Sequence, residues 1–198
     1  MVSPRNVAYR IDSADCITAV NDEWVSFALT NGDERLLPPQ VLGTSLWSWI
    51  GDEKTCQVYR SLLTRVRKDA ADVRFRFRCD APDRRRLLQM QMTLVSSDEV
   101  DFRTTTVHDE SRAAVDLMDA ATVRSDAILT ICGWCMRVPV TGTWLEIEEA
   151  VAALGLLEAE GVPSLSHGIC PACYDAMIAE MDSSELGHSG QVTLGALP

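Results

Sequence analysis

The first half of the chain alternates between short runs typical of strands and segments with the apolar spacing of helices. Two short strands are predicted at Tyr9 to Ile11 and Ile17 to Val20, with turn-forming residues between them. Helical structure is predicted at Glu23 to Thr30, at Trp47 to Ile50 and over Asp52 to Lys68, where apolar residues recur every four positions. The pattern therefore begins with two strands and continues with three helical segments.

Three longer strands follow these helical segments, at Asp72 to Cys79, Arg86 to Val95 and Val100 to Val107. In the first of them, apolar residues alternate with arginines, so that one face is apolar and the other is basic. The second strand shows the same alternation, with Leu and Met residues on its apolar face. The order is thus two strands, three helical segments and three strands.

This order of elements resembles that of a PAS domain, and short motifs extend the resemblance over residues 7–108 to a group of PAS-like proteins from bacteria. The resemblance implies an α+β fold in which helices lie on one face of an antiparallel five-stranded sheet. It also implies a sensory or protein-interaction module, in which a ligand can lie between the sheet and the helices. The motifs are Asn21-Asp22-Glu23-Trp24, Phe27-Ala28, Asn31-Gly32, Gly43 with Leu46-Trp47, Phe77-Arg78-Cys79-Asp80-x-Pro82 and Arg85-Arg86.

Two familiar ligands of such modules do not fit this sequence, so the PAS ligand stays unidentified. The flavin-binding photosensors share an Asn-Cys-Arg-Phe-Leu-Gln motif that this chain lacks. Haem sensors generally need an axial His, and none of the three histidines lies on the helices before the central strands. Cys56 is a less favoured haem ligand, because Cys16, Cys56 and Cys79 are better explained as buried small apolar residues.

Residues 109–128 are predicted to form a helical connector, because apolar residues recur there at approximately helical spacing. PAS-like domains often pair through helices that flank the core, so the resemblance implies a homodimer. A brace packed within one chain is the alternative. The apolar positions of this stripe are Ala114, Leu117, Met118, Ala121 and Ile128.

Four of the seven cysteines form two Cys-x-x-Cys pairs, which are the strongest chemical signal in the chain. Cys132 and Cys135 form the first pair, and Cys170 and Cys173 form the second after 34 intervening residues. Two such turns can bring four thiolates to one centre, which predicts a tetrahedral site for one structural zinc ion. His167, three residues before the second pair, is an alternative ligand that could replace one of the cysteines.

Other interpretations of the cysteine pairs stay open beside zinc. Iron of the rubredoxin type is less favoured, because Met136 and Tyr174 stand where that class usually has Gly. Redox-active dithiols are less favoured because no βαβ pattern surrounds the pairs, and a site without metal is the remaining alternative. The alternative function is therefore a thiol-based redox switch or an oxidoreductase.

The region around the cysteines is predicted to be a small, mainly helical module over residues 129–182, followed by a flexible tail over residues 183–198. Thr143 and Glu146 have the spacing of a capping box, and a further short helix is predicted at Asp175 to Met181. A unit of about 45 residues has little core, so a metal ion would be needed for its stability. The apolar face of the capped helix would hold Ile147, Ala150, Val151, Leu154 and Leu157.

This region also resembles a known family, a cysteine-rich tail attached to PAS, GAF and receiver domains in bacterial signalling proteins. The resemblance covers about residues 129–178 and rests most on the string from His167 to Cys173. It supplies no activity for the tail itself. Trp134 and Trp144 are predicted to cover the metal from water.

The charge of this 198-residue chain is unevenly divided, and it weakens one class of function. Residues 1–108 contain 15 basic and 15 acidic residues, whereas residues 109–198 contain 3 and 14, which accounts for the whole net charge of −11. The basic stretch from Tyr59 to Arg86 is predicted to be a solvated or acid-paired sheet face. A nucleic-acid partner is not expected, because the acidic chain would repel a polyanion.

The remaining signals exclude membrane insertion and several classes of enzyme. No run approaches the roughly 18 apolar residues of a membrane helix, and the N-terminus lacks a signal core, so a cytoplasmic protein is expected. Phosphate-binding glycine loops, nucleophile elbows and kinase motifs are absent from the sequence. Together these observations predict a non-catalytic bacterial signal-transduction protein, in which a PAS-like sensing or interaction module is coupled to a structural zinc module and acts on a protein partner.

Overall fold

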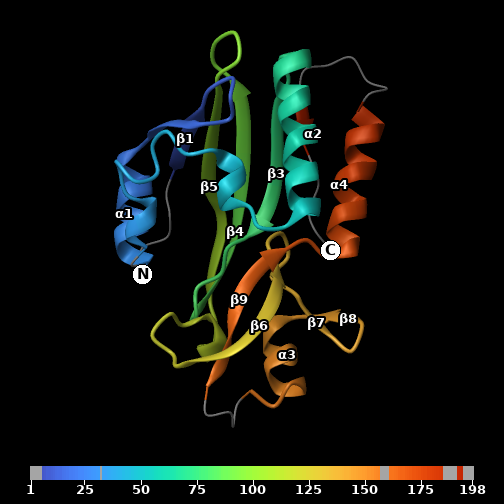
Figure 1. Cartoon of the computed structure of the whole chain (residues 1–198). Helices are drawn as coiled ribbons and strands as arrows, with labels where there is room; N and C mark the ends of the chain where they lie inside the picture. Colours follow the sequence, from blue (N-terminus) through green and yellow to red (C-terminus); the bar gives the residue numbers. More distant parts are fainter. Residues whose placement is uncertain (1–5, 32, 157–160, 185–190, 194–198) are drawn as a thin grey trace.

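A sheet of six strands is the largest element of the fold in the computed structural model, which describes residues 6–31, 33–156, 161–184 and 191–193. The strand order is β10-β3-β4-β5-β1-β2, and the five strands from β3 to β2 are antiparallel neighbours (Figure 1). The predicted α+β fold with five antiparallel strands is therefore confirmed. These strands are β1 (Val7–Ile11), β2 (Ile17–Val20), β3 (Asp72–Arg78), β4 (Arg84–Leu94) and β5 (Val100–Ser111).

The apolar alternation along β3 and β4 builds the inner face of this sheet. Val73 lies opposite Met92, and Phe75 lies opposite Met90, in the antiparallel register of the two strands. Met92 in turn lies opposite Phe102 of β5. These five side chains are buried, because residues two apart in a strand point to the same face.

Helices cover the apolar face of the sheet. The helix α2 begins after Asp52, whose carboxylate accepts a hydrogen bond of 2.7 Å from the N–H of Thr55, and it buries Val58, Leu62 and Val66. Figure 1 shows α4 beside α2, and the two helices pack against each other. The helical elements of this layer are α1 (Asp22–Asn31), η1 (Glu34–Leu36), η2 (Leu46–Trp49), α2 (Glu53–Asp69) and α4 (Pro171–Ser184).

The region around the cysteines contains strands as well as the predicted helices. Its strands β6 and β9 form a parallel pair, and β7 and β8 form a hairpin. The prediction of a mainly helical module over residues 129–182 did not include these four strands. The elements are β6 (Arg124–Cys132), β7 (Val138–Val140), β8 (Thr143–Leu145), α3 (Ile147–Ala153) and β9 (Val162–Gly168).

The prediction of a helical connector over residues 109–128 is wrong. The strand β5 continues to Ser111, where it pairs with Arg84, and the only helical piece described between β5 and β6 is the short turn η3 (Asp116–Met118). Leu117 is 1% exposed but Ile128 is 73% exposed, so the predicted stripe does not form one buried face. Pairing between strands that are distant in sequence overrides the local helical spacing here.

The predicted capping box at the start of α3 is also wrong. Thr143 lies in β8, and the side chain of Glu146 makes no capping hydrogen bond although Glu146 is the residue before the helix. Instead, Glu146 accepts hydrogen bonds from two arginines, which are described below. The predicted buried positions Ile147, Ala150 and Val151 are confirmed, whereas Leu154 is exposed and Leu157 lies outside the described residues.

The end of the chain departs from the predicted flexible tail over residues 183–198. The strand β10 (Gln191–Thr193) runs parallel to β3 at the edge of the main sheet, with Val192 opposite Val73. Residues 185–190 and 194–198 lie outside the described part of the chain. Among the described helices, none is both long and apolar enough to cross a membrane.

Candidate metal centre

The topology places the two cysteine pairs side by side. Because β6 and β9 are parallel neighbours, their carboxyl ends meet at the same edge, where Cys132 lies opposite Gly168. Each cysteine pair begins at or just after that edge. The N–H of Gly133 donates a hydrogen bond of 2.8 Å to the carbonyl of Gly168, which joins the first cysteine turn to the end of β9.

The four paired cysteines are buried, and their sulfur atoms all lie within 4.8 Å of one another. The Sγ atoms of Cys135 and Cys170 are 3.8 Å apart. A tetrahedral zinc ion with Zn–S bonds of about 2.3 Å requires sulfurs about 3.8 Å apart, whereas a disulfide requires about 2.05 Å. The arrangement therefore fits four free thiols around one metal ion.

Hydrogen bonds to sulfur favour the charged form that a metal needs. The backbone N–H of Cys170 donates to Sγ of Cys132, and that of Cys173 donates to Sγ of Cys170, both at 3.4 Å. Hydrogen bonds from the thiols of Cys135, Cys170 and Cys173 hold the pKa of Cys132 below its usual value, and the N–H of Cys170 adds to this effect. The cluster can therefore hold a thiolate even before a cation arrives.

The turn after the first cysteine pair bears on the choice between zinc and iron. Met136 has a φ of +61°, and its N–H donates a hydrogen bond of 2.9 Å to the carbonyl of Cys132. Rubredoxin-type iron was less favoured because Gly is missing here and at Tyr174. The objection is removed at Met136, which adopts the left-handed conformation that usually favours Gly, but it stands at Tyr174, which lies within α4.

His167 is not part of the group of four sulfurs. Its side chain is exposed on β9, although the residue precedes Gly168 and the second cysteine pair by only a few positions. A side chain at Gly168 would crowd Thr130 of β6, because a Cβ atom at this position would lie 3.1 Å from Cγ2 of Thr130. The structure thus brings the four predicted cysteines together and leaves the alternative ligand outside their group.

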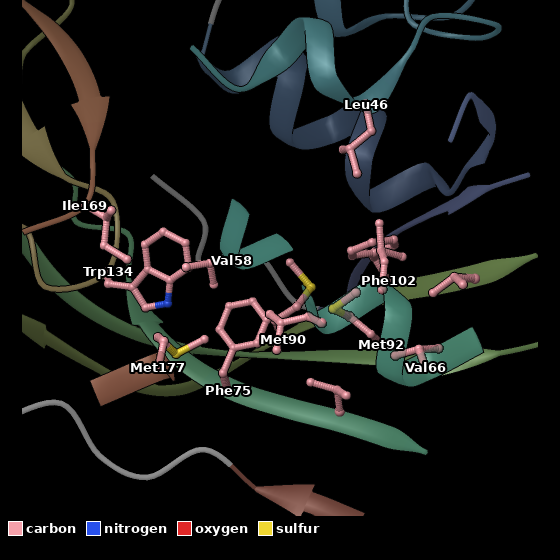
Figure 2. Packing of buried hydrophobic residues seen from close by; sticks show 14 of the residues in the cluster. Leu46, Val58, Val66, Phe75, Met90, Met92, Phe102, Trp134, Ile169 and Met177 are labelled. Carbon is pink, nitrogen blue, oxygen red and sulfur yellow. The ribbon is translucent and has the colours of Figure 1, made fainter. Parts of the chain in front are cut away.

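The predicted shielding tryptophans lie against the main core. Trp134 is buried beside Phe75 (Figure 2), with the two ring centroids 6.1 Å apart. The ring centroid of Tyr59 lies 5.9 Å from that of Trp134. Trp144 is half-buried and packs against the same core. The four cysteines belong to this core too, so one continuous apolar cluster contains both the inner face of the sheet and the candidate metal centre.

Arg78, at the end of β3, is the residue that most directly connects the sheet to the metal centre. Its backbone N–H donates to the carbonyl of Trp134 at 2.7 Å, and its Nη1 donates to the carbonyl of Cys135 at 3.1 Å. The same Nη1 donates to Glu146 at 2.6 Å. Arg78 was predicted to lie on a basic sheet face, and this role was not predicted, although the acidic excess of the second half could have indicated it.

A buried carboxylate lies at the centre of this junction. The side chain of Asp80 is completely buried and accepts hydrogen bonds from the guanidinium groups of Arg78 and Arg112 and from the N–H of Arg86. Glu148 of α3 accepts from Arg112 at 3.2 Å and from Arg85 at 2.9 Å. The prediction of an acid-paired basic face is confirmed at Arg78 and Arg85, whose partners come from both halves of the chain: Asp80 from the first, and Glu146 and Glu148 from the acidic second.

The Glu146→Gln variant tests this junction through pH. Burial would raise the pKa of Glu146, but hydrogen bonds from Arg78 and Arg137 outweigh burial and lower it. The ion pairs of Glu146 therefore stabilise the fold fully above about pH 4.5, the pKa of this carboxyl in the unfolded chain. That stabilisation is lost as the pH falls through the lower pKa that Glu146 has in the folded chain. In urea unfolding at pH 7, we expect the free energy of unfolding of Glu146→Gln to be about 1.5–3 kcal/mol below that of the wild type. This difference should shrink as the pH is lowered.

The matched control for this experiment is Glu149→Gln, an exposed position on the helix that Glu146 precedes. It should change the free energy of unfolding by less than about 0.5 kcal/mol. Both variants keep all four cysteines, so any release of metal in acid affects them equally. A deficit for Glu146→Gln that stays constant from neutral to acidic pH would contradict the ion-pair account.

Comparison with known proteins adds a limited likeness of fold. No family model and no curated protein matches the chain. Among solved structures, it is similar to the photoactive yellow protein domain from the sensor histidine kinase Ppr from Rhodospirillum centenum, with 17% identity, a TM-score of 0.38, and coverage of 52% of this chain and 92% of that one. It is also similar to a domain of an HTR-like protein from Haloarcula marismortui, with 19% identity, a TM-score of 0.37, and coverage of 54% and 100%.

Proposed function

We propose that this chain is a non-catalytic bacterial signal-transduction protein, in which a PAS-like sensing or interaction region is coupled to a metal-binding region. The proposed metal is one structural zinc ion held by Cys132, Cys135, Cys170 and Cys173. The proposed output is a contact with a protein partner in the cytoplasm, and the proposed active form is a homodimer. The signal would pass from the sheet to the cysteine turns through Arg78 and Trp134.

The observation that carries this proposal is the position of the four sulfurs inside the core that also contains the inner face of the sheet. A metal site in an independent tail would stabilise only the tail. Here the first cysteine turn packs on Phe75 through Trp134 and accepts a backbone hydrogen bond from Arg78. A change in the sheet region therefore has a short physical route to the metal centre.

Elemental analysis of the purified, untagged protein tests the metal directly. We expect one zinc ion per chain and no absorption band in the visible range, because zinc has a filled d shell. Iron bound by four thiolates would give a visible band and would contradict the zinc assignment. A chain purified without any metal would contradict the metal-binding region altogether.

The second candidate is a thiol-based redox switch, and one specific observation supports it. The thiols of Cys135 and Cys170 are 3.8 Å apart, so a modest movement after oxidation would allow a disulfide. Oxidation would then release the metal and disorder the cysteine turns. Zinc that stays bound under mild peroxide, at a dose that oxidises the half-buried Cys16, would count against the switch.

A further inference from the structure

A cavity of about 230 Å³ lies between the sheet, the helical layer and the first cysteine turn. Tyr9 and Phe77 line it from the sheet, and Trp49 and Tyr59 line it from the helical layer. Its remaining wall comes from the metal-binding region, through the segments 133–134 and 167–168. Two regions that are far apart in the sequence therefore line one space.

The chemistry of the cavity defines the kind of molecule that fits it. Of the described residues that line it, none is Asp, Glu, Lys or Arg, and aromatic side chains predominate. Burial raises the pKa of Tyr9, and it raises the pKa of Tyr59 to about 12, so both phenols stay neutral. A dry apolar cavity of about 150 Å³ is enough for benzene, so this one has room for one or two rings but not for a flavin or haem.

One buried polar group in the wall is unsatisfied. The indole N–H of Trp134 has no hydrogen-bond partner among the described residues, and the side chain is 3% exposed. A buried donor left without an acceptor costs about 1–3 kcal/mol. This nitrogen is itself covered, so a ligand in the cavity does not reach it; the donors that a ligand's acceptor atom can use are the neutral phenols of Tyr9 and Tyr59, which line the cavity. An apolar ligand of the same shape would leave these donors unused.

The first cysteine turn belongs to the metal centre and to the cavity at once. Gly133 and Trp134 line the cavity, and they are the two residues between Cys132 and Cys135. The carbonyl of Gly168, on the same wall, holds the N–H of Gly133. A metal ion that fixes the two cysteines therefore also fixes this wall, and a ligand that presses on the wall acts on the metal centre.

We propose that this cavity binds a small, uncharged, planar molecule of one or two rings with a hydrogen-bond acceptor, and that its binding is thermodynamically linked to metal binding through Gly133 and Trp134. The linkage is reciprocal: the ligand raises the affinity for the metal by the same factor as the metal raises the affinity for the ligand. This inference rests on the proposed function and names the class of molecule that would be sensed. Zinc content alone tests the metal site, so the two can fail separately.

Quinoline is a suitable probe, because it is planar, bicyclic, neutral at pH 7 and carries one acceptor nitrogen. Ligand-detected NMR titration should show that quinoline binds the zinc-loaded protein more tightly than naphthalene, which has the same shape without an acceptor. It should also bind more tightly than 2-naphthoate, since a carboxylate would enter a cavity whose described lining holds no Lys or Arg. Equal binding of all three, or no binding of quinoline, would overturn the inference.

A pair of matched variants places the probe in the cavity. Ile50 lines the cavity, and Ile50→Trp should fill it and weaken quinoline binding at least about tenfold, equivalent to about 1.4 kcal/mol. Ile128→Trp makes the same change at a residue that is 73% exposed, and it should leave the affinity unchanged. Equal effects of the two variants, or no effect of Ile50→Trp, would show that quinoline binds elsewhere.

The linkage is measured at the metal centre of the folded protein. With cadmium in place of zinc, quinoline should shift the cadmium NMR signal of the wild-type protein but not that of Ile50→Trp. In competition with a chelator, saturating quinoline should raise the apparent zinc affinity about fivefold or more, the lower end of typical couplings between sites. Quinoline that binds in the cavity without changing the cadmium signal or the zinc affinity would overturn the proposed linkage.

Discussion

Replacing Cys170 by Ser is expected to remove the metal and to destabilise the whole chain, including the sheet region. Structural zinc contributes apparent binding free energies of about 10–16 kcal/mol in small zinc-finger peptides, so the loss of one ligand should lower the free energy of unfolding by several kcal/mol. The four cysteines share one core with Phe75 and Trp134, so the loss should spread from the cysteine turns to β3. Thermal unfolding, followed by circular dichroism and by tryptophan fluorescence, should show one early transition with both probes.

Cys16→Ser is the matched control, because Cys16 is a half-buried free thiol outside the group of four. This variant should keep one zinc per chain and unfold near the wild-type temperature. Two separate transitions in Cys170→Ser, the later one at the wild-type temperature, would show instead that the metal-binding region is an independent tail. Wild-type zinc content in Cys170→Ser would contradict the ligand assignment itself.

The second large effect is expected from Asp80→Ala, at the buried junction between the two regions. The carboxylate of Asp80 is fully buried and lies against Arg78 and Arg112, so its removal leaves two guanidinium groups without their shared partner. Breaking a buried ion pair from one side typically costs about 3–5 kcal/mol. Urea unfolding should therefore show that the free energy of unfolding falls by this amount. The zinc affinity should also fall, because Arg78 donates a hydrogen bond to the carbonyl of Cys135.

The comparison variant is Glu53→Ala, which removes an acidic side chain that is 85% exposed and paired with Arg60. Exposed ion pairs contribute about 0–1 kcal/mol, so this variant should unfold close to the wild type. If Asp80→Ala and Glu53→Ala lowered the free energy of unfolding by similarly small amounts, water would reach the junction and satisfy the hydrogen-bonding groups of the arginines. The buried network would then not join the two regions.

The sheet and its helices were predictable from the sequence because their signals are local. The alternation from Val73 to Phe77 and the four-residue spacing from Val58 to Val66 both reflect burial against a single core. The predicted bounds of β1 to β5 and of α2 therefore lie within a few residues of the observed ones. The two cysteine pairs were predictable for a similar reason, since each pair is a local turn with a fixed spacing.

The region after β5 was harder to predict because its strands depend on distant partners. Residues 124–132 form β6 only through parallel pairing with β9, about 36 positions further along the chain. Local spacing suggested a helix instead. The run Ile128-Leu129-Thr130-Ile131, rich in β-branched residues, was the available signal for a strand and was overlooked.

The junction between the two regions could not be predicted from spacing at all. Arg78 and Glu146 are 68 positions apart, and Arg112 and Glu148 are 36 apart. The division of charge into a neutral first part and an acidic second part was the only global hint of these contacts. It indicated complementary surfaces without indicating which residues meet.

Hydrogen exchange before and after removal of the metal tests the central claim most directly, namely that the metal centre is part of the core it shares with the sheet. The account predicts that a chelator increases the exchange of amides in β3 and α2 together with those around Cys132 and Cys135. It would be contradicted if β3, β4 and β5 kept their full protection while only residues 129–184 lost theirs.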